Sequence, residues 1–86
     1  MHELSVALEI CRMAEERLTP DRRPRLRCVG VIVGDDAGIE PDNLEFCLEA
    51  LLAQPPFGGA VPSIQRIPGD ELALAYLQVE DDRPDH

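Results

Sequence analysis

Residues 26–33, Leu-Arg-Cys-Val-Gly-Val-Ile-Val, are the stretch that decides the fold of this 86-residue chain. The run is rich in β-branched residues and nearly continuous in hydrophobicity, which is typical of a central strand. We therefore predict a central strand here, covered by helix on one face. Residues 34–38, Gly-Asp-Asp-Ala-Gly, end this strand in a turn. The turn lacks the alternating oxygen ligands and closing Glu of a calcium-binding loop, so calcium is not expected.

A helix is predicted before this strand. From Glu3 to Leu18 the apolar side chains recur at helical spacing, and Pro20 then ends the helix because proline disfavours helical geometry at the preceding residue. We expect the buried stripe to consist of Leu4, Ala7, Leu8, Cys11, Ala14 and Leu18. A second apolar face carries Val6, Ile10 and Met13, and it indicates contacts with a partner or a second copy.

Another helix is predicted after the strand. Pro41 suits the first position of a helix, and the negative charge of Asp42 is favourable near the positive end of the helix dipole. Its expected buried stripe is Leu44, Cys47, Leu48 and Leu51, with Phe46 and Ala50 beside it. Gln54-Pro55-Pro56 closes this helix.

Two further strands are predicted over residues 61–67 and 71–80, joined by the turn Pro68-Gly69-Asp70. Because so short a link joins them, we expect an antiparallel hairpin. The element order α-β-α-β-β predicts an α+β fold, a two-layer sandwich of two helices on a three-stranded sheet. We expect a single domain over residues 1–80, followed by an acidic tail at residues 81–86.

Composition excludes several classes of protein. The formal net charge is -9, with eight Arg, no Lys and 17 acidic residues, so binding to nucleic acid or to anionic membranes is not expected. No apolar run approaches the ~20 residues that span a bilayer, and no leader peptide is recognised, so we expect a cytoplasmic protein. Three cysteines without a C-x-x-C pair indicate small buried hydrophobes in a reducing compartment.

The sequence does not indicate an enzyme. It contains no nucleophile elbow and no phosphate-binding glycine loop, and His2 and His86 are its only histidines. Asp35 and Asp36 are adjacent carboxylates, but their turn offers no base or electrophile. The arginines of residues 22–27 are interpreted as a solvated cluster, with an acidic-partner site as the alternative.

Met1-His2-Glu3 is the candidate metal site. The α-amine of Met1, the His2 imidazole and deprotonated backbone nitrogens can close chelate rings, and such nitrogen-rich square-planar sets suit Ni(II) and Cu(II). Glu3 can add an oxygen ligand, or it can orient the imidazole by accepting a hydrogen bond from it without binding the metal. The alternative interpretation of these three residues alone is a loose chain end with an incidental histidine.

Three segments together resemble the HypA/HybF family of hydrogenase nickel-incorporation proteins. The first is Met-His-Glu-Leu-Ser followed by a helix. The second is residues 29–41, Val-Gly-Val-Ile-Val-Gly-Asp-Asp-Ala-Gly-Ile-Glu-Pro, which is similar to the family signature V-x-V-x-x-G-E-L-S-G-V-x-P with Asp35 in place of Glu. The third is the closing strand, from Gly69-Asp70-Glu71-Leu72 to Val79-Glu80.

The resemblance implies a metallochaperone that binds Ni(II) transiently. It implies docking on a nickel-maturation GTPase and delivery of nickel to the large subunit of a [NiFe] hydrogenase, or to urease. His2 is then the principal ligand, with the Met1 amine and Glu3 beside it. Members of the family carry a zinc-binding insertion with two C-x-x-C pairs between the last two strands, where this chain has only Pro68-Gly69. We therefore expect a nickel-binding domain without structural zinc.

A second hypothesis keeps the fold and drops the metal. The chain would then be an assembly factor or a subunit of a hydrogenase-related complex, and His2 would be dispensable. The extra apolar face of the first helix favours this hypothesis, since it predicts a homodimer or a heteromer formed through that helix.

Overall fold

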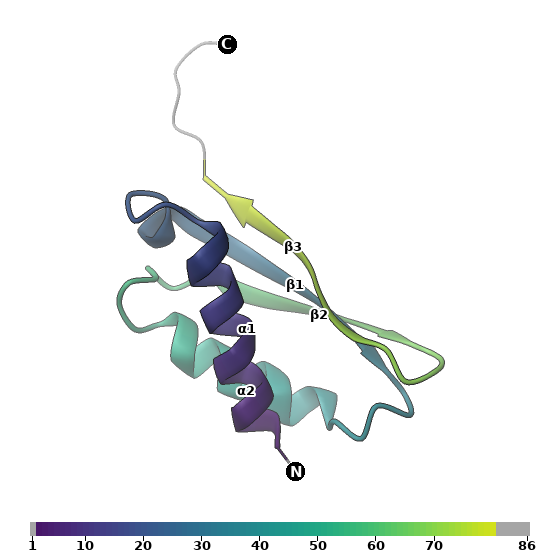
Figure 1. Ribbon diagram of the computed structural model, residues 1–86. Helices are drawn as coiled ribbons and strands as arrows, with labels where there is room; N and C mark the ends of the chain where they lie inside the picture. The colour runs from purple at the N-terminus through teal and green to yellow at the C-terminus, as the bar shows by residue number, and fades with distance from the viewer. Residues whose placement is uncertain (1, 81–86) are drawn as a thin grey trace.

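The computed structural model describes residues 2–80 and confirms the two-layer α+β architecture. In chain order the elements are α1 (Glu3–Arg17), the short 3-10 helix η1 (Arg23–Arg25), β1 (Leu26–Gly34), α2 (Pro41–Leu52), β2 (Val61–Ile67) and β3 (Leu72–Val79). Figure 1 shows α1 and α2 on the same face of the three-stranded sheet. Both helices therefore shield one side of β1, as its nearly continuous apolar run predicts.

The predicted hairpin of β2 and β3 is wrong. The sheet order is β2-β1-β3, with β2 parallel and β3 antiparallel to the central β1. Residues 68–71 therefore cross the C-terminal end of β1 instead of making a hairpin turn. The amide of Asp35 donates to the carbonyl of Ile67 at 2.8 Å, and the amide of Asp36 donates to that of Gly69 at 2.7 Å. These bonds satisfy the backbone of the crossing.

Two glycines allow the crossing to lie so close to β1. A Cβ atom added to Gly34 would lie 2.3 Å from the carbonyl oxygen of Gly69, a distance that no side-chain carbon tolerates. Gly69 itself has φ +95°, in the left-handed region that favours glycine. The short link between β2 and β3 thus depends on the absence of a side chain at both positions.

The core lies between the helices and the sheet, and on α1 it matches the predicted stripe only in part: Ala14 and Leu18 are buried as predicted, as is Ala7. Ala7, Ile10 and Ala14 are buried, whereas Leu4 is 55% and Leu8 51% exposed. Apolar residues cover more than one side of this helix, so periodicity alone does not determine which side faces inward. The small Ala7 and Ala14 let the helix approach its neighbours closely, which selects that side.

The remaining core residues come from α2 and β1. Leu44, Leu48 and Leu52 of α2 are fully buried, while Cys47 and Leu51 of the predicted stripe are half-buried. Val29, Val31 and Val33 of β1 point toward the helices and complete the core. All three cysteines are free thiols at half-buried positions.

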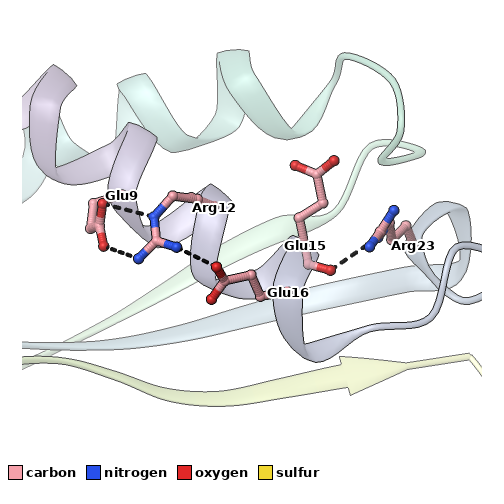
Figure 2. Close-up of polar contacts among 5 residues, drawn as sticks. All are labelled: Glu9, Arg12, Glu15, Glu16 and Arg23. Atoms are coloured by element: carbon pink, nitrogen blue, oxygen red, sulfur yellow. Dashed lines mark hydrogen bonds and ion pairs between the residues drawn. The ribbon is translucent and has the colours of Figure 1, made fainter.

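Polar contacts define the end of α1 and its outer surface. The Nε of Arg23 donates to the backbone carbonyl of Glu15 at 3.0 Å (Figure 2) and to that of Leu18 at 3.1 Å. These bonds satisfy acceptors that a helix end leaves open. Figure 2 also shows Arg12 between Glu9 and Glu16, bonded to both carboxylates. Within the arginine cluster, Arg23 therefore has a structural role.

Candidate metal site at the start of the first helix

His2 occupies the position that immediately precedes α1. Its backbone has φ -136° and ψ 35°, and its side chain makes no capping hydrogen bond to the helix. The residue is exposed, and its carbonyl accepts the first helical bond from the amide of Val6 at 2.9 Å. The helix thus fixes the backbone of His2. Because the side chain is exposed and does not cap the amides at the helix start, the imidazole is accessible from solvent.

Glu3 is bound to the start of the other helix. Its Oε2 accepts a hydrogen bond from the backbone amide of Glu40 at 2.8 Å, across 37 positions of sequence. Glu40 in turn caps α2, because its own carboxylate accepts from the amide of Asn43 at 3.0 Å. The first residues of α1 are therefore held against the beginning of α2, and both helices begin at the same end of the helix layer (Figure 1).

The two side chains are electrostatically tuned by this arrangement. The hydrogen bond from Glu40 is the main cause that lowers the pKa of Glu3, so its carboxylate is ionised at neutral pH. Loss of hydration lowers the pKa of the His2 imidazole, the positive chain terminus lowers it further, and Glu3 opposes both. The neutral imidazole is the form that binds metals, and it is thus favoured at neutral pH.

Of the three predicted site residues, the structure describes two. His2 and Glu3 are adjacent at the start of α1, whereas Met1 lies outside the described residues. Within residues 2–80, no three His, Cys, Asp or Glu side chains converge into a metal-binding group. A nickel site in this part of the chain would therefore require backbone nitrogens or the α-amine in addition to side chains.

Sequence reasoning missed the contribution of Glu40. The pair Glu40-Pro41 marks a helix start, but nothing in the local sequence indicates that its amide reaches a residue of α1. The contact arises because the two helices pack side by side and begin at the same end. It is a tertiary feature without a local signal.

Two other reactive side chains of the described residues, Cys11 and Asp35, are each constrained by their surroundings. Burial and the nearby charge of Glu15 raise the pKa of the Cys11 thiol to about 11, so it is protonated at neutral pH and a poor nucleophile. Asp35 lies 3.8 Å from Arg66, which gives this turn carboxylate a partner on β2. None of the helices in the described residues is long and apolar enough to cross a membrane.

The second apolar face of α1 is largely used within the fold. Val6, Ile10 and Met13 line a cavity of about 280 Å³ between α1 and β3, together with Leu72 and Leu74. The prediction that these three residues contact a partner is wrong for Ile10, which is buried. The apolar residues that α1 leaves exposed are instead Leu4 and Leu8, close to His2 in sequence.

Comparison with known proteins gives a consistent family. The family model described as hydrogenase/urease nickel incorporation, metallochaperone, HypA matches residues 1–72. The hydrogenase maturation factor HypA of Azotobacter chroococcum mcd 1 is 35% identical over 74 residues, which cover 86% of this chain and 66% of that protein. The HypA of Albidiferax ferrireducens is 28% identical over 78 residues, which cover 91% and 69%.

A third relative, the HypA of Azotobacter vinelandii, is also 35% identical over 74 residues and again has 66% of its length covered. The chain thus spans about two thirds of the length of these relatives. The match includes the opening residues, the β1–α2 segment and the beginning of β3.

Proposed function

This chain belongs to the HypA family of hydrogenase/urease nickel-incorporation metallochaperones, and from that premise we propose that it binds Ni(II) at Met1, His2 and Glu3 during hydrogenase maturation. Nickel is cargo in this proposal, bound transiently and then passed on. The observation that supports this proposal is the hydrogen bond from the Glu40 amide to Glu3. This bond fixes the position of Glu3, the neighbour of the exposed His2.

The chemistry of the donors supports nickel. An exposed imidazole, a terminal amine and backbone nitrogens form a nitrogen-rich set that suits square-planar Ni(II). Protons compete for every one of these ligands, so the affinity for Ni(II) should fall as the pH is lowered. An exposed position at the start of a helix also suits a site from which metal must leave.

We propose that Glu3 acts mainly by holding the start of α1 in place. One of its oxygens already accepts the Glu40 amide, so the carboxylate anchors the start of α1 beside α2 and offers its negative charge next to His2. Such outer groups tune metal affinity without being principal ligands.

Calorimetric titration of the protein with Ni(II), with no residue added before Met1, tests the binding step. We expect His2→Ala to abolish binding, because it removes the principal side-chain ligand. His86→Ala is the matched control, since it removes the other histidine of the chain. Equal Ni(II) binding by wild type and His2→Ala would contradict the proposal.

Delivery is a separate step, for which we propose a nickel-maturation GTPase and a hydrogenase large subunit as partners. Leu4 and Leu8 are half exposed and follow His2 on α1, so a protein that docks there would contact the metal site and an apolar surface together. Leu8→Ser should then weaken capture of the GTPase while leaving Ni(II) affinity unchanged.

The alternative is an assembly factor that keeps the interaction surface and has no metal role. The exposure of Leu4, Leu8 and the 71% exposed Phe46 favours it. A protein that binds its maturation partners equally well with His2→Ala, and that shows no Ni(II) binding in either form, would support this alternative.

Two further expectations accompany the proposal. The 86 residues contain no C-x-x-C pair, so we propose that they hold no structural zinc. Residues 1–80 are proposed to fold as one domain without the acidic residues 81–86, which lie outside the described structure. Elemental analysis of purified protein and the folding of a chain ending at Glu80 test these two points.

A further inference from the structure

Strand β3 is one of the two outer strands of the sheet, and no described strand pairs with its outer edge (Figure 1). Natural proteins usually protect such an edge with charged residues, proline or a covering segment, because its free backbone groups can pair with another chain. The other outer strand, β2, contains Pro62 and Arg66, which are protections of this kind. The eight residues of β3, Leu-Ala-Leu-Ala-Tyr-Leu-Gln-Val, include neither a charge nor a proline. The outer edge of β3 is therefore open to pairing.

The hydrogen-bond pattern shows which backbone groups of β3 face outward. The amide of the last residue of β1 donates to the carbonyl of Glu71 at 2.6 Å, so these two residues form a hydrogen-bonded pair of the antiparallel ladder. Such pairs alternate with non-bonded pairs, so Ala73 also bonds to β1, whereas Leu72 and Leu74 direct their N–H and C=O groups outward. Ala75 has no partner on β1, and this bulge ends the regular edge after residue 74.

This part of the edge borders the cavity of about 280 Å³ between α1 and β3. The side chains of Leu72 and Leu74 line the cavity from the strand, and Val6, Ile10 and Met13 line it from the helix. The cavity reaches the surface, since Leu72 is 39% exposed and Val6 and Met13 are half-buried. An apolar cavity of roughly 150 Å³ accepts a benzene-sized group, so this cavity has room for one or two large apolar side chains.

We propose that the edge groove, formed by the free edge of residues 72–74 and the cavity beside it, binds an extended segment of a partner protein as a fourth strand. The backbone of the segment pairs with the outward N–H and C=O groups of Leu72 and Leu74, and every second side chain enters the cavity. The free backbone groups specify an extended occupant. A helix satisfies its own backbone, and a small apolar molecule has no groups that pair with the edge.

The charge beside the edge groove specifies a basic segment. Glu9 lines the cavity, and Asp70 and Glu71 directly precede β3. The carboxylates of Glu9 and Glu16 share one guanidinium, that of Arg12, so negative charge is in excess beside the cavity. A segment with a net positive charge is therefore attracted to the edge groove and is steered toward it during association.

A second copy of this chain fits the edge groove poorly. Its own β3 carries no basic residue. Antiparallel pairing of two β3 edges would extend the sheet and place the two α1 helices, with Glu9 and Glu16, on the same side of it. Because each chain has a formal charge of -9, such pairing adds repulsion between like charges.

Binding of a labelled peptide to the whole chain, measured by fluorescence anisotropy without metal, tests this proposal independently of nickel. The probe is a peptide of about six residues, the usual length of a strand, in which Leu and Lys alternate. A peptide with Ser for Leu keeps the charge, and one with Glu for Lys keeps the apolar side chains. A third, methylated at every backbone nitrogen, keeps both but cannot donate to β3. Each of the three should bind about tenfold more weakly or worse.

Hydrogen exchange of individual amides, followed by NMR, locates the bound peptide. In the free protein the amides of Leu72 and Leu74 should exchange rapidly, whereas that of Ala73 is protected by its bond to β1. The saturating Leu-Lys peptide should slow the exchange of Leu72 and Leu74 about tenfold or more, because their N–H groups then bond to the added strand. The amide of Ala73 is the internal control and should stay protected throughout.

A pair of variants at Leu72 tests the edge from the side of the protein. Leu72→Pro removes one outward N–H without breaking a bond to β1, and proline is tolerated at the first residue of an edge strand. Leu72→Ala is the matched control, since it also loses the leucine side chain but keeps the N–H. Leu72→Pro should bind the Leu-Lys peptide about fivefold more weakly than Leu72→Ala, which is the effect of one hydrogen bond. Circular dichroism verifies that both variants fold.

Three results would overturn the proposal. Equal affinity for the methylated and unmethylated peptides would show that the backbone of the edge is not used. Unchanged exchange at Leu72 and Leu74 in the peptide-bound protein would place the peptide elsewhere. Protection of these two amides that rises with protein concentration, in the absence of peptide, would identify a second copy as the occupant.

Discussion

The backbone amide of Glu40 lies 2.8 Å from Oε2 of Glu3, so the first turn of α1 is attached to the start of α2 by a charge-assisted hydrogen bond. This contact fixes the first turn of α1, and with it the position of Glu3, relative to the start of α2. It connects the stability of the helix layer to the candidate metal site.

Removal of this contact should weaken nickel binding while leaving the principal ligand in place. We expect Glu3→Ala to raise the Kd for Ni(II) about tenfold, as loss of an outer-sphere orienting group commonly does. Glu3→Gln keeps a neutral acceptor for the Glu40 amide and should have a smaller effect. Calorimetry with Ni(II) measures both, and equal affinities in all three proteins would contradict an orienting role.

Gly34→Ala should destabilise the fold, because its Cβ would collide with the carbonyl of Gly69 and push the crossing link off β1. We expect a loss of about 2 kcal/mol in the free energy of unfolding, typical of overpacking against backbone. Urea denaturation measures it. Gly38→Ala is the comparison, since it meets no atom and costs only the strain of φ +77°, about 1 kcal/mol.

Leu48→Ala and Phe46→Ala should differ sharply although both shorten an apolar side chain of α2. Leu48 is fully buried, and its truncation should cost about 3 kcal/mol through lost burial and a residual cavity. Phe46 is 71% exposed, so Phe46→Ala should change the free energy of unfolding by less than about 0.5 kcal/mol. Similar urea midpoints for the two variants would contradict the packing of α2.

The Cys11 thiol should lose its proton at a higher pH than an exposed cysteine does. Burial and the charge of Glu15 raise its pKa from 9.0 to about 11, so the folded chain disfavours the thiolate. Because the unfolded chain releases this proton near pH 9, the contribution to stability is present below that pH and is lost as pH rises toward 11. The alkylation rate of a Cys28→Ser, Cys47→Ser protein against pH measures the thiol, and a rate that saturates near pH 9 would contradict its burial.

Local signals in the sequence were sufficient for the elements but not for their arrangement. Pro20 and Pro41 mark the end of one helix and the start of the other, and a continuous apolar run marks β1. The predicted helices and strands therefore match the structure closely. The length of the link after Ile67 does not tell whether the two strands it joins pair with each other. Here β1 lies between them, so a short link crosses its end.

The candidate site shows the same division. His2 and Glu3 were identified from their residue types and from a family resemblance, both of which are properties of sequence. Their fixation by Glu40 depends on the packing of two helices. The same packing buries Ile10 and leaves Leu4 and Leu8 exposed, which the apolar periodicity of α1 does not reveal.

The crossing link has a consequence for how the molecule can be extended. β2 ends and β3 begins on opposite sides of β1, so residues 67 and 72 are separated by about two strand spacings, roughly 10 Å. A folded domain inserted between Gly69 and Asp70 would be joined to the sheet by two separate short segments, one from β2 and one to β3. The two connections would restrict the orientation of the inserted domain relative to the sheet. This link is therefore a suitable insertion site for a reporter domain or a second functional domain.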